Sequence, residues 1–145
     1  MQWKLISHGT ECSYALVLSE SDEVVSTIET FAREHGLTAS RLSAIGALRD
    51  VRLGYFDWDR KEYEPIDFDE QLEVLSLLGD VVLHGDLPKL HAHVVLGRRD
   101  GSTCGGHLLR ATVRPTLEVL LTESPAHLRR EFDPKSGLPL IRITF

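Results

Sequence analysis

The sequence predicts a single α+β domain with a mainly antiparallel or mixed β-sheet and one main helix. Short apolar runs rich in β-branched residues recur along the chain, separated by turn residues, and such runs are typical of strands. One segment, residues 22–35, carries the apolar spacing of an amphipathic helix. No Pro-, Ser- or Gly-rich linker divides the 145 residues, so we expect one compact domain over residues 1–145.

The N-terminal part of the chain predicts two strands followed by the helix. Residues 3–7 and 13–18 are short apolar runs and form the expected strands. Residues 19–23 contain Ser and Asp, which are good N-cap residues, and their acids favour a helix N-terminus. Apolar residues then recur every three or four positions, and Gly36 is the expected C′ residue of a helix over 22–35.

The remainder of the chain predicts strands with turns between them. Asp57–Arg60 has the composition of a hairpin turn, and Pro125–Arg130 predicts a short helical turn. The expected strands are residues 41–46, 51–57, 61–66, 72–80, 81–83, 90–96, 106–109, 112–121 and 140–145.

Composition narrows the possible partners and the compartment. The net charge of −6 argues against a general phosphate-binding surface, because nucleic-acid affinity is dominated by Lys and Arg. The densest basic pairs, Arg98-Arg99 and Arg129-Arg130, are interpreted as solvated surface residues. No secretory signal and no membrane-spanning apolar run is visible, so we expect a reducing cytoplasm with Cys12 and Cys104 as free thiols.

Three histidines form the most informative pattern in the chain. His91 and His93 lie in the apolar run 90–96, and alternate residues of a strand share a face, so their Cα atoms lie about 6.5–7 Å apart. A turn-like segment at 98–102 then returns the chain to Gly105-Gly106-His107, where glycine permits close backbone approach or a bulge. Three imidazoles with an open fourth position are typical of a catalytic zinc site.

Other interpretations of these histidines stay open at this point. The same pair also fits core or exposed histidines, because a chain with seven histidines contains such spacings by chance. His84 is a spare ligand candidate that we expect to face solvent, and Cys104 is a weaker one. A cupin also uses a His-x-His strand, but it would place Glu four or five residues later, where residues 96–98 are Leu, Gly and Arg. His8, His35 and His127 are interpreted as surface residues.

Several stretches resemble one known family along nearly the whole chain. The chain is similar to the PPC domain family (plants and prokaryotes conserved domain, DUF296), in its stand-alone bacterial form. The matching stretches are Ile45–Val51, Leu53–Asp57, Leu72–Gly79, Leu90–His93, Asp100-Gly101, Gly105–Leu108, Val113–Val119 and Arg130–Asp133, and they occur in the family's order.

The resemblance implies a fold, an assembly and a shared site. It implies a compact α/β domain that forms homotrimers, with His91, His93 and His107 as the family's histidine cluster, and a distant likeness to the zinc-dependent acetolactate decarboxylase fold group. Plant members join this domain to AT-hooks that bind DNA, and bacterial members are often labelled DNA-binding. This chain has no AT-hook, since no Arg-Gly-Arg core is present. Its acidic charge makes DNA a poor partner.

Three functional hypotheses follow. The first is a metal-dependent enzyme or small-molecule-binding protein, with zinc or another divalent metal on the three histidines. Glu118, and second Glu73, are the candidate base or fourth ligand, and Arg49 is a candidate for holding a substrate carboxylate. The second is an assembly module with a structural or regulatory metal. The third is a transcription-associated DNA-binding protein. No nucleophile motif, P-loop or dinucleotide fingerprint assigns a reaction.

Overall fold

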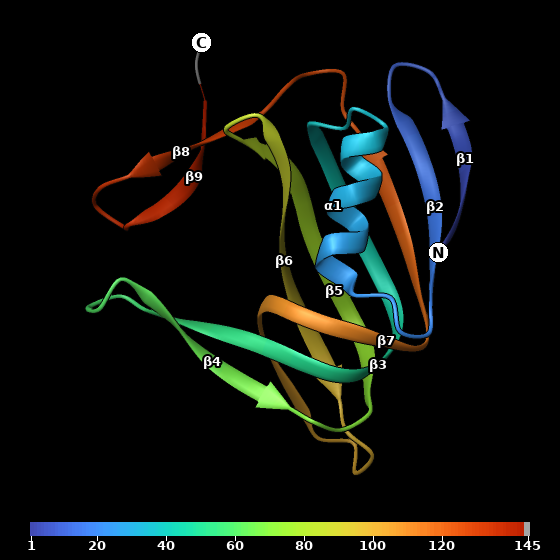
Figure 1. The fold of residues 1–145 in the computed structure, drawn as a ribbon, viewed down its shortest axis with the longest axis vertical. Helices are drawn as coiled ribbons and strands as arrows, with labels where there is room; N and C mark the ends of the chain where they lie inside the picture. Colours follow the sequence, from blue (N-terminus) through green and yellow to red (C-terminus); the bar gives the residue numbers. More distant parts are fainter. Residues whose placement is uncertain (144–145) are drawn as a thin grey trace.

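The computed structural model describes residues 1–143, which form a nine-stranded sheet and one helix (Figure 1). All strand pairs are antiparallel except the short parallel pair between β5 and β8, so the sheet is mixed as predicted. In order, the strands are β1 Gln2–His8, β2 Cys12–Ser19, β3 Ala39–Asp57, β4 Glu62–Phe68, β5 Leu72–His84, β6 Leu87–Gly97, β7 Thr103–Glu123, β8 Arg129–Asp133 and β9 Leu138–Arg142.

The strands β3, β5, β6 and β7 form a closed ring of pairings. Strand β3 pairs with β5, β5 with β6, β6 with β7, and β7 with β3. This closure depends on the length of β3 and β7, at 19 and 21 residues, because each strand changes neighbour along its length. The expected breaks inside β3, β5 and β7 are therefore wrong as strand ends. Register shifts at Gly46 on β3 and near Ser76 on β5 show that the chain bulges and stays paired.

The helix α1, Val24–Glu34, covers one face of the sheet (Figure 1). Its fully buried side chains Val24, Ile28, Phe31 and Ala32 recur at the spacing that the sequence predicted, and they join the main apolar cluster. The helix begins two residues after its predicted start at residue 22, and its N-cap is not one of the Ser and Asp candidates. Glu23 is the N-cap, and its carboxylate accepts hydrogen bonds from the backbone N–H groups of Val25 and Ser26.

Two regions of the chain differ from the prediction. Pro125–Arg130 forms no helical turn: residues 125–126 form a bend, and strand β8 starts at Arg129. This strand was not predicted, because it is short and its pairing with β5 joins residues 46 positions apart in sequence. His35 is also not a simple surface residue, because its ring stacks on Phe31 with ring centroids 4.1 Å apart. The last predicted strand is observed as Leu138–Arg142, and residues 144–145 lie outside the described part.

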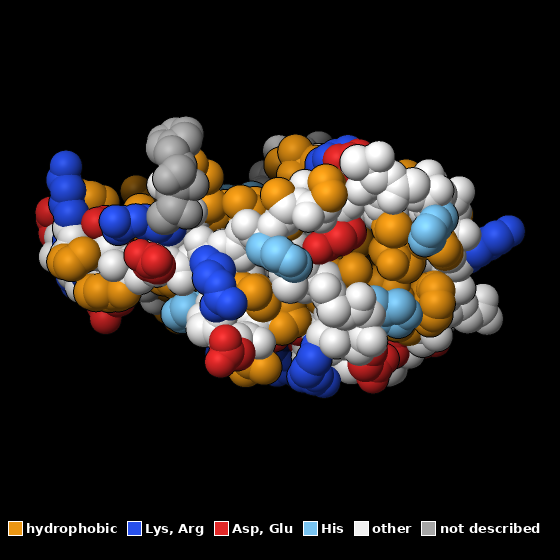
Figure 2. Space-filling model, turned by 90° about the horizontal axis from the view of Figure 1, so that it is seen from above, with side chains coloured by type: hydrophobic (Ala, Val, Ile, Leu, Met, Phe, Trp, Pro, Cys, Tyr) orange, Lys and Arg blue, Asp and Glu red, His pale blue; other side chains and the backbone are white. Residues whose placement is uncertain are grey.

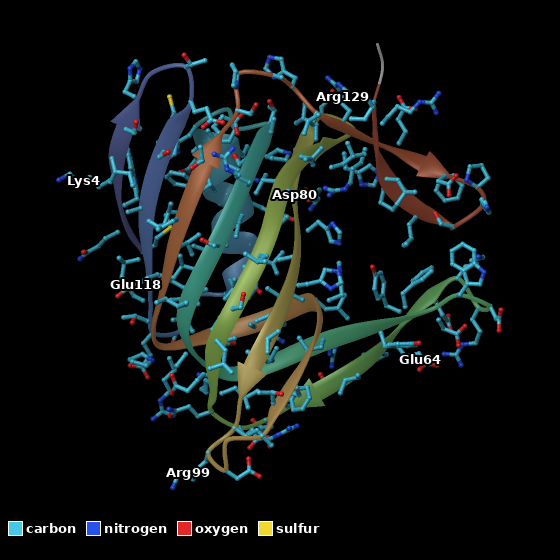
Figure 3. The ribbon with its side chains drawn as sticks, turned by 180° about the vertical axis from the view of Figure 1, so that it is seen from behind. Lys4, Glu64, Asp80, Arg99, Glu118 and Arg129 are labelled. Carbon is cyan, nitrogen blue, oxygen red and sulfur yellow. The ribbon has the colours of Figure 1, made fainter. Side chains whose placement is uncertain are left out.

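Two hairpins project from the same side of the sheet (Figures 1 and 3). One consists of the end of β3 with β4, and its turn at residues 58–61 begins one residue after the predicted turn Asp57–Arg60. The other consists of β8 and β9. Their turns meet, because the side chain of Lys61 packs against the backbone of Gly137. The turns of the two hairpins therefore lie side by side.

No helix within residues 1–143 combines the length and the apolar character that a membrane crossing requires. Cys12 and Cys104 are both free thiols.

Candidate metal centre

The structure brings His91, His93 and His107 together from two neighbouring strands. His91 and His93 lie on β6, where the residues between and beyond them, Ala92 and Val94, are buried in the core. The alternation of the strand therefore directs both histidines away from the core. His93 lies directly opposite His107 in the register between β6 and β7. One nitrogen from each of the three rings lies within 4.8 Å of the other two.

Two glycines make room for this arrangement. A Cβ atom on Gly105 would lie 2.6 Å from the carbonyl oxygen of Val94, so glycine lets β7 approach β6 as the sequence suggested. A Cβ atom on Gly54, which is paired with His107, would lie 2.7 Å from the ring of Tyr63. With glycine there, the Tyr63 ring stacks on His107 with ring centroids 4.5 Å apart.

The protonation of His107 suits metal binding. Burial, and then the neighbouring charges of His91, His93 and Arg130, lower the pKa of His107 to about 4. Its ring is therefore neutral at pH 7, as a metal ligand must be. Among residues 1–143, its buried Nδ1 atom finds no hydrogen-bond partner. An unpartnered buried nitrogen costs free energy, and a metal ion bound to it would remove that cost.

An ion pair lies directly behind His91. The Nη2 atom of Arg130 donates to Asp80 at 2.6 Å and lies 3.2 Å from Nδ1 of His91, and Oδ2 of Asp80 lies 3.8 Å from the same nitrogen. Burial alone would raise the pKa of Asp80, but the interactions with His91 and Arg130 outweigh it and hold the pKa below its usual range. With Nδ1 of His91 turned toward this pair, Nε2 is left for a metal. A carboxylate behind a ligand histidine fixes the ring's orientation.

Arg130 and Asp80 were not identified as site residues from the sequence. Arg130 was interpreted as a solvated residue, but its side chain is only 8% exposed. Tyr63 was missed as well. The only signal for Arg130 was its place in the last stretch shared with the resembling family.

A pocket of about 200 Å³ opens beside the histidines. Its wall combines apolar side chains, largely from β9, with a few basic and polar groups. It is lined by Tyr63, His84, Lys89, Leu90, His91, His107, Arg130, Leu138, Pro139 and Leu140. The spare candidate His84 is exposed, as expected, and stands at this pocket without joining the cluster of three.

The structure places the three candidate catalytic residues away from this pocket. Glu118 is exposed on β7, which is separated by β3 from the strand of Asp80. In Figure 3 it lies at the left of the view, and the two hairpins lie at the right. Glu73 is exposed at the start of β5 and faces the groove beside Arg98 and Arg99. Arg49 donates to its neighbour Asp50 at 2.9 Å. None of the three lines the pocket that His91 and His107 line, and Cys104 instead packs against the core.

The histidine cluster fits a divalent metal in donor type and in number. Imidazole nitrogens bind zinc at about 2.0–2.1 Å, so two of them at a tetrahedral angle lie roughly 3.3 Å apart. The nitrogens of this cluster lie within 4.8 Å of one another, a separation that side-chain rotations can close.

The chain as a whole is similar to several solved structures. A metal-containing protein from Archaeoglobus fulgidus is 37% identical, with a TM-score of 0.84 over 96% of this chain and 95% of that chain. A plant- and prokaryote-conserved (PPC) protein from Pyrococcus horikoshii is 30% identical, with a TM-score of 0.86 over 99% and 96%. A candidate DNA-binding protein from Bacteroides thetaiotaomicron is 26% identical, with a TM-score of 0.87 over 97% and 96%.

A more distant likeness concerns the fold alone. A Staphylococcus aureus protein of unknown function, similar to alpha-acetolactate decarboxylase, is 13% identical with a TM-score of 0.55, over 81% of this chain and 52% of that chain. This agrees with the fold group that the resemblance implied.

No curated protein matches the sequence of this chain. The family model of the Plants and Prokaryotes Conserved (PCC) domain matches residues 7–125, and the chain belongs to this family.

Proposed function

We propose that this protein binds one divalent metal ion, zinc, on His91, His93 and His107, and that it acts as a metal-dependent small-molecule-binding protein. The observation that carries the proposal is the convergence of three imidazole nitrogens from β6 and β7 within 4.8 Å, beside an open pocket. A relative at 37% identity is described as metal-containing, which supports a metal here. Zinc is preferred because three histidines with an open position are typical of zinc sites, although imidazole also suits Ni, Cu and Fe.

The pocket explains why we favour ligand binding over a closed structural site. Structural zinc sites use four protein ligands, whereas this cluster offers three and opens on a cavity. When bound, zinc would supply a Lewis acid for a ligand oxygen and would lower the pKa of a bound water. Tyr63 and the Asp80–Arg130 pair hold His107 and His91 in place.

The test is metal content per chain, measured by inductively coupled plasma mass spectrometry on protein purified without a His-tag. We expect about one zinc per chain in the wild type and in the control His84→Ala, which alters a histidine at the same pocket outside the cluster. The double variant His91→Ala/His93→Ala should lose the metal and keep its circular dichroism spectrum. Full metal content in the double variant would refute the site.

Homotrimeric assembly is part of the proposal and rests on the sheet face opposite α1. Exposed apolar side chains cluster there on five neighbouring strands, and a contiguous apolar surface of this kind marks an interaction site. We call this set the apolar face: Val17, Ile45, Leu75, Leu78, Val95 and Leu120.

Transcription-associated DNA binding is the alternative, because two relatives are described as candidate DNA-binding proteins. The charge distribution supports it poorly. Most of the arginines near the surface pair with acids, as in Arg41–Glu11, Arg52–Asp67 and Arg98–Glu70. In the face of the molecule in Figure 2, basic and acidic side chains are interspersed. The reducing cytoplasm stays our prediction for its compartment, consistent with the two free thiols.

A further inference from the structure

We propose that the pocket beside the histidines binds a small carboxylate, whose anionic end meets the metal and Arg130 and whose carbon chain lies against the apolar wall of β9. The inference rests on the proposed metal site and names the class of ligand for it. Its evidence is the charge balance of the pocket, the position of Arg130 and the composition of the wall.

The charges around the pocket favour an anionic ligand. No Asp or Glu is among the residues that line it. Asp80 lies behind His91 and is matched by Arg130, and Lys89 at the pocket wall is matched by Glu29 at 2.9 Å. Three neutral imidazoles leave the two charges of a divalent metal uncompensated. In a partly enclosed site, an anionic ligand is the partner that would neutralise them.

The guanidinium of Arg130 is positioned to bind a carboxylate. Its side chain is 8% exposed and held by Asp80, so the guanidinium has a fixed position at the pocket wall. Within residues 1–143, every hydrogen bond that it makes leaves from Nη2. The donors on Nη1 and Nε therefore remain for a ligand, and a planar guanidinium matches a carboxylate in geometry.

The apolar part of the pocket lining favours a ligand with a carbon chain over inorganic phosphate. Leu138, Pro139 and Leu140 of β9 and Leu90 of β6 line the pocket together with one arginine and with Lys89, which pairs with Glu29. Phosphate sites usually gather several donors or use a helix N-terminus, and the N-terminus of α1 is already capped by Glu23. At about 200 Å³, the pocket is smaller than cavities for drug-sized ligands, which start at about 300 Å³. A short aliphatic acid fits these limits.

The experiment is isothermal titration calorimetry of zinc-loaded protein with butanoate, with its neutral isostere butanamide, and with inorganic phosphate. Metal content is measured first in each sample. We expect butanoate to bind at least about tenfold more tightly than butanamide or phosphate, because only a carboxylate pairs with Arg130 and offers a carbon chain to the wall. Metal-free protein should lose most of this binding.

Arg130→Lys is the decisive variant, because it keeps the positive charge beside Asp80 and removes the planar fork. In samples whose zinc content has first been brought to that of the wild type, it should weaken butanoate binding by about tenfold, and Arg130→Met should weaken it further. The matched control is Arg129→Met, the exposed arginine next to it on β8. If Arg130 variants do not fold, the comparison of butanoate with butanamide on the wild type still decides.

The outcomes separate this inference from the metal proposal. Protein that takes up no zinc refutes the metal site, whatever the anion does. Zinc-loaded protein that binds butanamide or phosphate as tightly as butanoate overturns the carboxylate assignment and leaves the metal site intact. Unchanged butanoate affinity in folded, metal-loaded Arg130→Lys overturns the role of Arg130.

Discussion

His93 and His107 lie directly opposite each other on the adjacent antiparallel strands β6 and β7. Directly opposed residues on one face of a sheet have Cβ atoms about 4.5–5.5 Å apart. The register of two strands therefore sets the distance between two of the three candidate ligands, and His91, two residues away on the same face, completes the set. A cluster fixed by backbone pairing is preorganised, so its properties can be tested through the strands as well as through the histidines.

Gly105 tests the link between strand spacing and the site. In Gly105→Ala, the new Cβ would lie 2.6 Å from the carbonyl oxygen of Val94, so the strands must separate locally. We expect a loss of about 1–3 kcal/mol in the free energy of unfolding, together with weaker zinc binding. Urea denaturation and a zinc titration measure the two effects.

The control for this substitution is Gly9→Ala, because a Cβ at Gly9 meets its nearest atom only at 4.0 Å. Its free energy of unfolding should stay within about 0.5 kcal/mol of the wild type. Wild-type stability and zinc affinity in Gly105→Ala would show that the spacing of β6 and β7 does not set the site.

Metal removal should lower the stability of the folded protein. A ligand that binds only the folded state at 100 times its dissociation constant adds about 2.7 kcal/mol, so EDTA should lower the melting temperature of zinc-loaded protein. Differential scanning calorimetry with and without EDTA measures the change. His107→Ala should melt at one temperature in both conditions, whereas His84→Ala should respond as the wild type does. An EDTA response that persists in His107→Ala would contradict the assignment.

The lowered pKa of His107 predicts a pH dependence for the metal-free protein. Folding holds this ring neutral down to a pKa of about 4, whereas the unfolded chain takes up the proton near 6.5. Stability from this group is therefore complete above pH 6.5 and is lost as the pH falls from 6.5 toward 4. After allowance for the partial exposure of the ring, this loss in the free energy of unfolding amounts to about 2–3 kcal/mol.

Urea unfolding between pH 4.5 and 7.5 tests this dependence. Other groups titrate in the same range, so the informative quantity is the difference between the wild type and His107→Gln. The wild type should lose more stability on acidification than the variant does. Parallel curves for the two proteins would show that His107 is not held neutral by the fold.

The sequence predicts much of this site because its information is local. His91 and His93 follow the alternation of one strand, and a hairpin at 98–102 returns His107 beside them. The helix was predicted because its apolar residues keep a regular spacing. Asp80 and Arg130 could not be found in this way. They meet through the short parallel pairing of β5 with β8, and an isolated arginine after a turn has the pattern of a surface residue.

The Asp80–Arg130 pair should contribute more to stability than an exposed pair of the same length. Its Arg side chain is 8% exposed, whereas in the Arg52–Asp67 pair the side chains are 53% and 59% exposed, and both pairs have a 2.6 Å contact. Arg130→Met leaves Asp80 without its partner and should cost about 2–3 kcal/mol. The double variant Asp80→Asn/Arg130→Met should recover part of this loss. A double-mutant cycle by urea unfolding should give a coupling below about 1 kcal/mol for Arg52 and Asp67. Equal couplings would refute the role of burial.

The apolar face predicts how the chain assembles. Leu120 on β7 and Leu78 on β5 flank Ser43 in one rung of the sheet, and both leucines are more than half exposed in a single chain. Light scattering after size exclusion should give the wild type three times the 16.3 kDa of one chain.

Leu120→Lys places a charge in the middle of this face and should shift the protein toward the mass of one chain, because a buried unpaired ammonium is costly. Leu87→Lys is the control, since Leu87 is similarly exposed but lies at the start of β6, outside the apolar face. A wild-type protein with the mass of one chain would refute the trimer. A trimer that survives in Leu120→Lys would move the interface to another surface, because lysine in the centre of a dry interface would dissociate it.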